Sequence, residues 1–175
     1  MTTPTESTAA TTTPPRRPTE ADLELLGFAQ SAELTARDLY RQAIDAGAGD
    51  EHLASLVAIA AHHDAYAQAI SAVIGTAAPQ ARDEALYRSE TIKFRGNTNQ
   101  TALAAHELEN RLVVTHQSLL SQLDGIEGSS LIASILINEA RHATALAAIA
   151  GLSPIADIDA YLVTPDLAPL GASES

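Results

Sequence analysis

The chain has 175 residues, of which 46% are hydrophobic and only 3% aromatic, and its formal net charge is −12. This length suits one domain, and the low aromatic content favours packed helices over a β-sandwich. An acidic chain disfavours a phosphate-binding surface for nucleic acid. Because the sequence contains no cysteine, disulfides, iron–sulfur clusters and thiolate zinc sites are excluded.

Residues 1–18 are rich in Thr, Pro and Ser, which bury little apolar surface, so they predict a disordered N-terminal tail. Arg16 and Arg17 are followed by polar and acidic residues instead of the apolar core of an export signal. No apolar run free of turn signals is long enough to span a membrane. We therefore expect a cytoplasmic protein that binds neither membrane nor nucleic acid.

Four long segments with helical periodicity follow the tail. They cover about residues 19–46, 50–74, 98–123 and 130–150. Thr19 and Asp22 resemble a capping box at the start of the first segment. Residues 75–99 form a long connection, in which 82–93 favours a short helix. Since neighbouring helices are usually joined by short loops, this connection predicts a crossover from one end of a bundle to the other.

Each of the four segments carries ionisable residues near its middle, on its apolar face. These residues are Glu33, His63, Glu109, Glu139 and His142. In an antiparallel bundle the helix midpoints lie at one level, so the five side chains are predicted to converge in the core. Buried carboxylates and imidazoles cost free energy unless a metal ion or a hydrogen-bonding partner compensates them. Mixed carboxylate and imidazole ligands suit iron, manganese or zinc better than calcium or magnesium.

Other polar residues lie near these five in the helical pattern. Tyr40 and His116 each follow the central glutamate of their own helix by seven residues, which places them on the same face. We expect Tyr40 and Tyr66 to be core residues whose hydroxyls find partners, and His116 to pack beside the site or support it. His52 and His62 are expected on solvent-exposed faces.

The pattern of residues 19–151 resembles the ferritin-like di-iron carboxylate superfamily, which uses one Glu from each of two helices and Glu-x-x-His from each of the other two. Glu33 and Glu109 match the single glutamates, while Glu139 and His142 match one Glu-x-x-His pair. The resemblance implies an all-α fold, a ferritin-like up-down four-helix bundle with one long crossover between the second and third helices.

The second segment departs from the family pattern, because His63-Asp-Ala-Tyr66 stands where Glu-x-x-His is expected. An imidazole thereby replaces a bridging carboxylate, and a phenol replaces an imidazole, which favours one ion over a pair. The resemblance implies iron as the metal, with manganese or zinc as alternatives. It leaves open whether the domain is an enzyme with ferroxidase-like, oxygen or peroxide chemistry.

The alternative is a metal-free ferritin-like scaffold that acts as a structural or protein-interaction module. In such a scaffold, the buried carboxylates and imidazoles form hydrogen bonds with one another in place of bonds to a metal. The expected hydrogen-bonded pairs are Glu33–His63, Glu109–His116 and Glu139–His142.

Residues 152–175 form a C-terminal extended segment with three prolines. Its apolar side chains predict contact with the bundle or with a protein partner. They are Ile155, Ile158, Tyr161, Leu162 and Val163. Since ferritin-like domains often associate, a homodimer or higher homo-oligomer is also expected.

Overall fold

The computed structural model describes residues 13–162 and 165–171 of the chain. Four long helices dominate this described part: α1 (Glu20–Asp45), α2 (Leu53–Ile74), α4 (Thr98–Leu120) and α5 (Ile126–Ile149). Shorter elements are the 3-10 turns Asp50–His52, Gly75–Ala77 and Lys93–Arg95, and the helices α3 (Glu84–Glu90) and α6 (Asp159–Leu162). The described residues contain no strand, so the predicted all-α class is confirmed.

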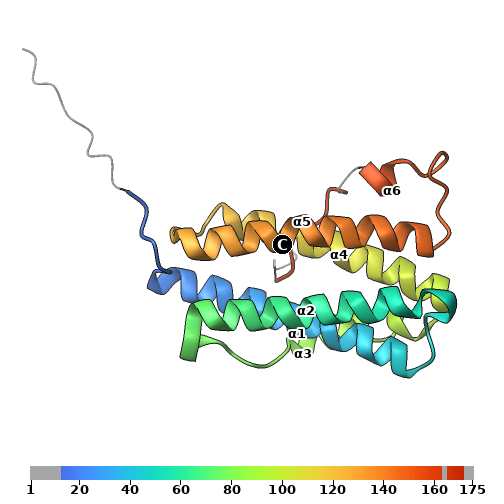
Figure 1. The fold of residues 1–175 in the computed structure, drawn as a ribbon, viewed down its shortest axis with the longest axis horizontal. Helices are drawn as coiled ribbons and strands as arrows, with labels where there is room; N and C mark the ends of the chain where they lie inside the picture. Colours follow the sequence, from blue (N-terminus) through green and yellow to red (C-terminus); the bar gives the residue numbers. More distant parts are fainter. Residues whose placement is uncertain (1–12, 163–164, 172–175) are drawn as a thin grey trace, which may run out of the picture.

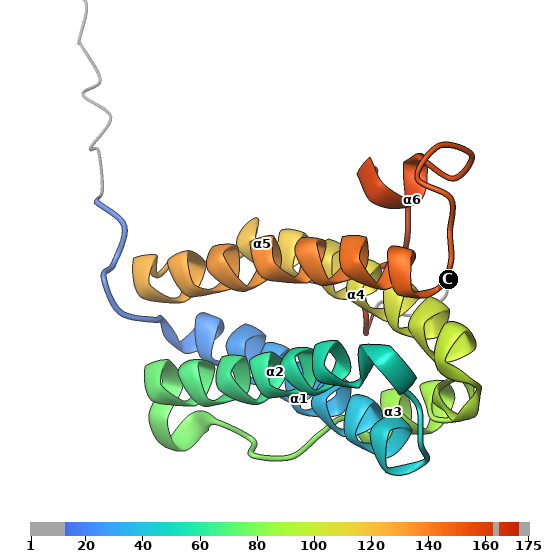
Figure 2. The same cartoon turned by 45° about the vertical axis from the view of Figure 1, so that its right-hand side comes forward.

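The long helices form two hairpins that pack against each other (Figure 1). Helix α1 pairs with α2, and α4 pairs with α5, each across a short connection. Helices α2 and α4 run in the same direction, so the chain between them returns along the bundle (Figure 2). The short helix expected over 82–93 forms only over Glu84–Glu90. The predicted four-helix bundle is confirmed.

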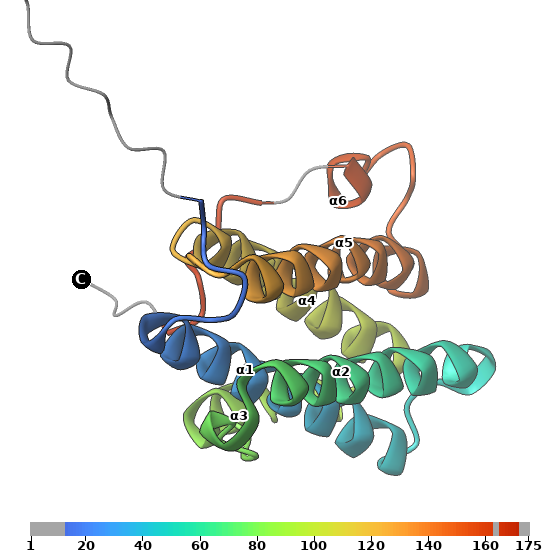
Figure 3. The same cartoon turned by 60° about the vertical axis from the view of Figure 1, so that its left-hand side comes forward.

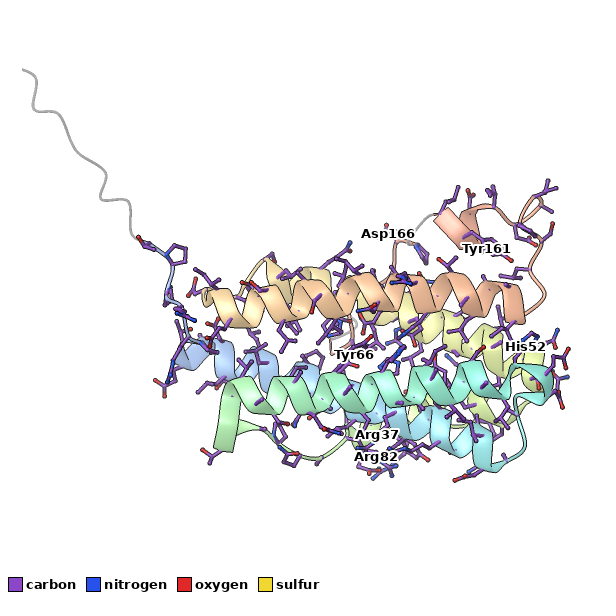
Figure 4. All side chains as sticks on the ribbon, viewed as in Figure 1. Arg37, His52, Tyr66, Arg82, Tyr161 and Asp166 are labelled. Atoms are coloured by element: carbon purple, nitrogen blue, oxygen red, sulfur yellow. The ribbon has the colours of Figure 1, made fainter. Side chains whose placement is uncertain are left out.

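The connection between α2 and α4 is fastened to α1 by polar contacts. The backbone N–H of Asp83 donates to Thr35 Oγ1 at 2.9 Å. Arg82 Nη1 lies 3.3 Å from Asp38 Oδ2, and Arg37 pairs with the other oxygen of Asp38 at 2.8 Å. Figure 4 shows Arg37 and Arg82 close together on this side of the bundle. These contacts hold the long connection without contributing to the buried polar centre.

Helix α5 begins four residues earlier than predicted, because preceding chain segments satisfy the N–H groups at its start. The carbonyl groups of Pro15 and Arg16 accept hydrogen bonds from the N–H groups of Ile126 and Glu127, both at 3.0 Å. Residues 127–130, expected to be a turn, therefore belong to the helix. The predicted tail includes Pro15 and Arg16, so contacts with the bundle begin before the predicted boundary at residue 18. Residues 1–12 lie outside the described residues.

The predicted capping box is present and has a second role. Thr19 and Asp22 exchange hydrogen bonds at the start of α1. The carboxylate of Asp22 also accepts from the N–H groups of Asp124 and Gly125, both at 2.9 Å. A Cβ on Gly125 would lie 2.9 Å from Asp22 Oδ2, so only glycine leaves room for this contact. Asp22 thus joins the start of α1 to the turn between α4 and α5.

The C-terminal segment contacts the bundle through a residue that the sequence interpretation overlooked. Leu170 is buried in the core, and its N–H donates to Thr115 Oγ1 at 2.8 Å. Figure 3 shows the segment after α6 passing back towards α1. Helix α6 contacts α5, but Ile155 and Leu162 are 88% and 76% exposed and do not cover the bundle. The alternative that these apolar residues contact a protein partner stays a prediction. Val163 lies outside the described residues.

The apolar core has two clusters, one on each side of a polar layer. One cluster includes Leu39, Leu56 and Leu146, and the other includes Leu26 and Ile70. On α2 and α5, the buried ionisable residues His63, Glu139 and His142 fall between the residues of these two clusters. The two apolar clusters therefore keep the polar layer away from the ends of the bundle.

Candidate metal centre

Six ionisable side chains from all four long helices form the polar layer. They are Glu33 of α1, His63 of α2, Glu109 and His116 of α4, and Glu139 and His142 of α5. Five are fully buried, and His142 is 7% exposed. The structure therefore brings together all five residues predicted from the sequence and adds His116.

The first group of possible ligands contains His63, Glu109 and His142. His63 Nε2 lies 2.9 Å from Glu109 Oε1, and His142 Nδ1 lies 3.3 Å from Glu109 Oε2. One possible ligand atom from each residue lies within 4.8 Å of the others. Two imidazoles and one carboxylate in this arrangement can hold a transition-metal ion and leave further coordination positions open.

The second group contains Glu33, His116 and Glu139, whose ligand atoms also lie within 4.8 Å of one another. His116 Nδ1 is 2.6 Å from Glu139 Oε2, and His116 Nε2 is 3.4 Å from Glu33 Oε1. The two groups meet where His63 Nδ1 lies 2.7 Å from Glu33 Oε2. Two adjacent groups of three possible ligands thus share one buried layer.

Three buried polar atoms lack a hydrogen-bond partner in the part of the chain that the structure describes. They are Glu33 Oε1, His116 Nε2 and Glu139 Oε1, and all belong to the second group. An unpaired buried polar atom costs about 1–3 kcal/mol. A metal ion accepts lone pairs from these atom types, so the residues present fit a metal ion.

Two hydrogen-bonded pairs expected for a metal-free core are wrong. Glu139 contacts His116 instead of His142, and Glu109 contacts His142 instead of His116. Helices α4 and α5 are antiparallel, so moving along α5 from residue 139 to 142 leads back along α4 from His116 towards Glu109. The expected pair of Glu33 with His63 is confirmed.

His116 was expected only to support the site, although its seven-residue spacing from Glu109 placed it on the inward face. The spacing alone could not show that α5 would present Glu139 at the level of His116. The sequence signal for this residue was therefore present, but its partners depend on how the two helices are aligned.

The tyrosines lie on either side of the first group. Tyr40 is fully buried, and its hydroxyl donates to Glu109 Oε1 at 2.6 Å. Burial, followed by the charge of Glu109, raises the pKa of Tyr40 well above its ordinary value, so it stays a donor. Tyr66 is half-buried beside His142 and belongs to neither group (Figure 4).

The pKa values of the ionisable side chains are shifted differently in the two groups. Burial opposes a charge on His63, but the carboxylates of Glu109 and Glu33 raise its pKa well above its ordinary value. Burial likewise favours a neutral Glu109, yet His63 and His142 lower its pKa. In the second group, burial raises the pKa of Glu139 and lowers that of His116. The surroundings thus favour the charged forms of His63 and Glu109 in the first group, and the neutral forms of Glu139 and His116 in the second.

The fold and the buried layer define a helical-bundle protein with an internal cluster of carboxylate and imidazole ligands. Residues 21–152 match the family model described as a ferritin-like domain, and the chain belongs to this family. No curated protein and no solved structure matches the chain. Among the described residues, no helix has the combination of length and apolar character needed to cross a membrane.

Proposed function

We propose that this ferritin-like domain binds iron or a similar transition metal in its core, at two adjacent positions. His63, Glu109 and His142 hold one ion, and Glu33, His116 and Glu139 hold the other. The observation that carries this proposal is the convergence of three unpaired, fully buried ligand atoms in the second group. Manganese and zinc fit the same ligand types.

The residues around the two groups position the ligands. The Tyr40 hydroxyl fixes Glu109 through a 2.6 Å hydrogen bond, and the indirect contacts of a ligand commonly set its orientation. Glu33 has one oxygen near His63 and the other near His116, so it contacts both groups of possible ligands. A bound redox-active metal would supply ferroxidase-like, oxygen or peroxide chemistry.

A metal-free scaffold is the second candidate, and one observation favours it. Both ring nitrogens of His63 contact carboxylates, Glu33 at 2.7 Å and Glu109 at 2.9 Å. An imidazolium between two carboxylates is compensated without a metal. In this case the domain would act through its surface. A cytoplasmic location, homo-oligomers and a protein partner for the C-terminal segment remain predictions.

Metal analysis by mass spectrometry separates the two functions. The full chain is purified without chelator, loaded with Fe²⁺ anaerobically, and compared with a Glu139→Ala/His142→Ala variant. The variant Glu51→Ala/His52→Ala is the matched control, because it removes an acid and a histidine from the exposed end of the bundle (Figure 4).

We expect two ions per chain in the wild-type protein and in the control, and loss of metal from the core variant. A wild-type protein that binds no metal before or after loading would contradict the metal proposal and support the scaffold.

A further inference from the structure

An exposed histidine lies directly outside the buried centre. His62 of α2 precedes His63 but faces solvent, whereas His142 is buried. Both line a pocket of about 270 Å³ whose other walls are Asn138 and Arg141 of α5. The pocket therefore lies between the surface of the bundle and the first ligand group.

His142 has contacts on both of its sides. Its Nδ1 lies 3.3 Å from Glu109 Oε2 in the core, and its Nε2 lies 2.9 Å from His62 Nδ1 in the pocket. The rings of His62 and His142 are nearly parallel, with 11° between their planes. His142 thus links the pocket to the core through a single imidazole ring.

The separation of the two outer nitrogens suits a shared metal ion. Zinc–imidazole bonds of about 2.0–2.1 Å place two neighbouring ligand nitrogens roughly 2.9–3.4 Å apart, depending on the angle at the metal. In the structure His62 Nδ1 and His142 Nε2 share a hydrogen bond at 2.9 Å, at the short end of this range, so an ion that replaces the shared proton would need only a small shift of the two rings.

We propose that His62 and His142 form an outer position where a divalent transition-metal ion is first bound on its way into the core. This inference rests on the proposed metal-binding function. The acidic net charge of −12 attracts cations towards the surface in general. Arg141 acts in the opposite direction, because its positive charge in the same pocket slows the approach of a cation.

The two pocket residues therefore have opposite predicted effects on the rate of metal uptake. The full chain is mixed with Co²⁺, and uptake is followed by stopped-flow absorbance of the ligated cobalt. The variants are His62→Ala and Arg141→Gln. The control is His52→Ala, which removes a histidine from the 3-10 turn that precedes α2, outside the pocket. Equilibrium dialysis of each protein gives the number of bound ions.

We expect His62→Ala to weaken metal binding at the outer position at least about tenfold, as the loss of groups around a metal site commonly does. Uptake should slow by a similar factor, while the number of tightly bound ions stays unchanged. Arg141→Gln should speed uptake, and His52→Ala should match the wild-type protein.

Wild-type uptake kinetics in His62→Ala would overturn the outer position, although core binding would stand. Loss of a tightly bound ion in this variant would also overturn it, because His62 would then be a core ligand. If the wild-type protein binds no Co²⁺, the proposed function itself fails.

Discussion

The most direct test of the second ligand group is the substitution His116→Gln. Gln keeps a polar side chain beside Glu139 and Glu33 but removes the imidazole, whose Nε2 has no hydrogen-bond partner among the described residues. If the group of Glu33, His116 and Glu139 holds an ion, the variant should bind one ion per chain where the wild-type protein binds two.

The expected effect on stability follows from the number of ions. An ion that binds only the folded protein stabilises it by about 2.7 kcal/mol when its free concentration is 100 times its Kd. Two such sites give about 5.4 kcal/mol, and loss of one site leaves about 2.7 kcal/mol. For a chain of this size, 1 kcal/mol corresponds to about 2–4 °C in Tm. The Tm increase on metal addition should therefore fall from about 10–20 °C to about half of that.

The assay is differential scanning calorimetry with and without metal, beside metal counting on the same samples. The variant His52→Gln is the control, since it changes a half-buried histidine at the start of α2, away from the polar layer. A His116→Gln protein that keeps two ions and the full Tm increase would refute the assignment of His116 as a ligand. The two-group arrangement would then lose its support.

Three further predictions concern residues around the polar layer and at the ends of the bundle. Tyr40→Phe removes the hydroxyl from buried Glu109, so urea titration should show about 1–3 kcal/mol lower stability; an unchanged midpoint would contradict this. Burial alone would raise the pKa of Asp22, but backbone hydrogen bonds to its carboxylate outweigh burial and lower the pKa. The carboxylate therefore stabilises the fold at pH values above its unfolded pKa of about 4, and this stabilisation is lost as the pH falls from there through the lowered pKa of the folded state. Asp22→Asn should therefore be destabilising at pH 7, and the difference should shrink below about pH 4; a constant difference would disprove the role of the charge. Leu170→Ala should cost about 2 kcal/mol in the same titration, whereas no loss would mean that the C-terminal segment does not support the core.

The helices and the polar layer could be predicted because both depend on local periodicity. Glu33 and His63 fall on apolar faces near helix midpoints, and antiparallel packing of any such helices brings the midpoints together. The Thr19 capping box was also visible, since its residues are three apart in the sequence. These features need no knowledge of the distant contacts.

The remaining features depend on contacts between residues distant in the sequence. The start of α5 is set by carbonyl groups more than a hundred residues earlier, at Pro15 and Arg16. Leu170 is buried whereas Ile155 and Leu162 are exposed, because the chain beyond α6 returns to the core while α6 packs against α5 at the surface. Hydrophobicity alone could not distinguish these three residues.

Including His116 among the possible ligands changes the interpretation of the substitutions in the second helix. The family pattern of two single glutamates and two Glu-x-x-His pairs supplies four carboxylates and two imidazoles, which is six ligand residues. Here the polar layer holds three carboxylates and three imidazoles, again six, because α4 provides His116 where α2 has lost an imidazole. The exchange removes one negative charge while preserving the number of possible ligands. Since imidazole suits zinc, copper, iron and nickel, whereas carboxylates also suit magnesium and manganese, the change should favour the former ions instead of abolishing binding.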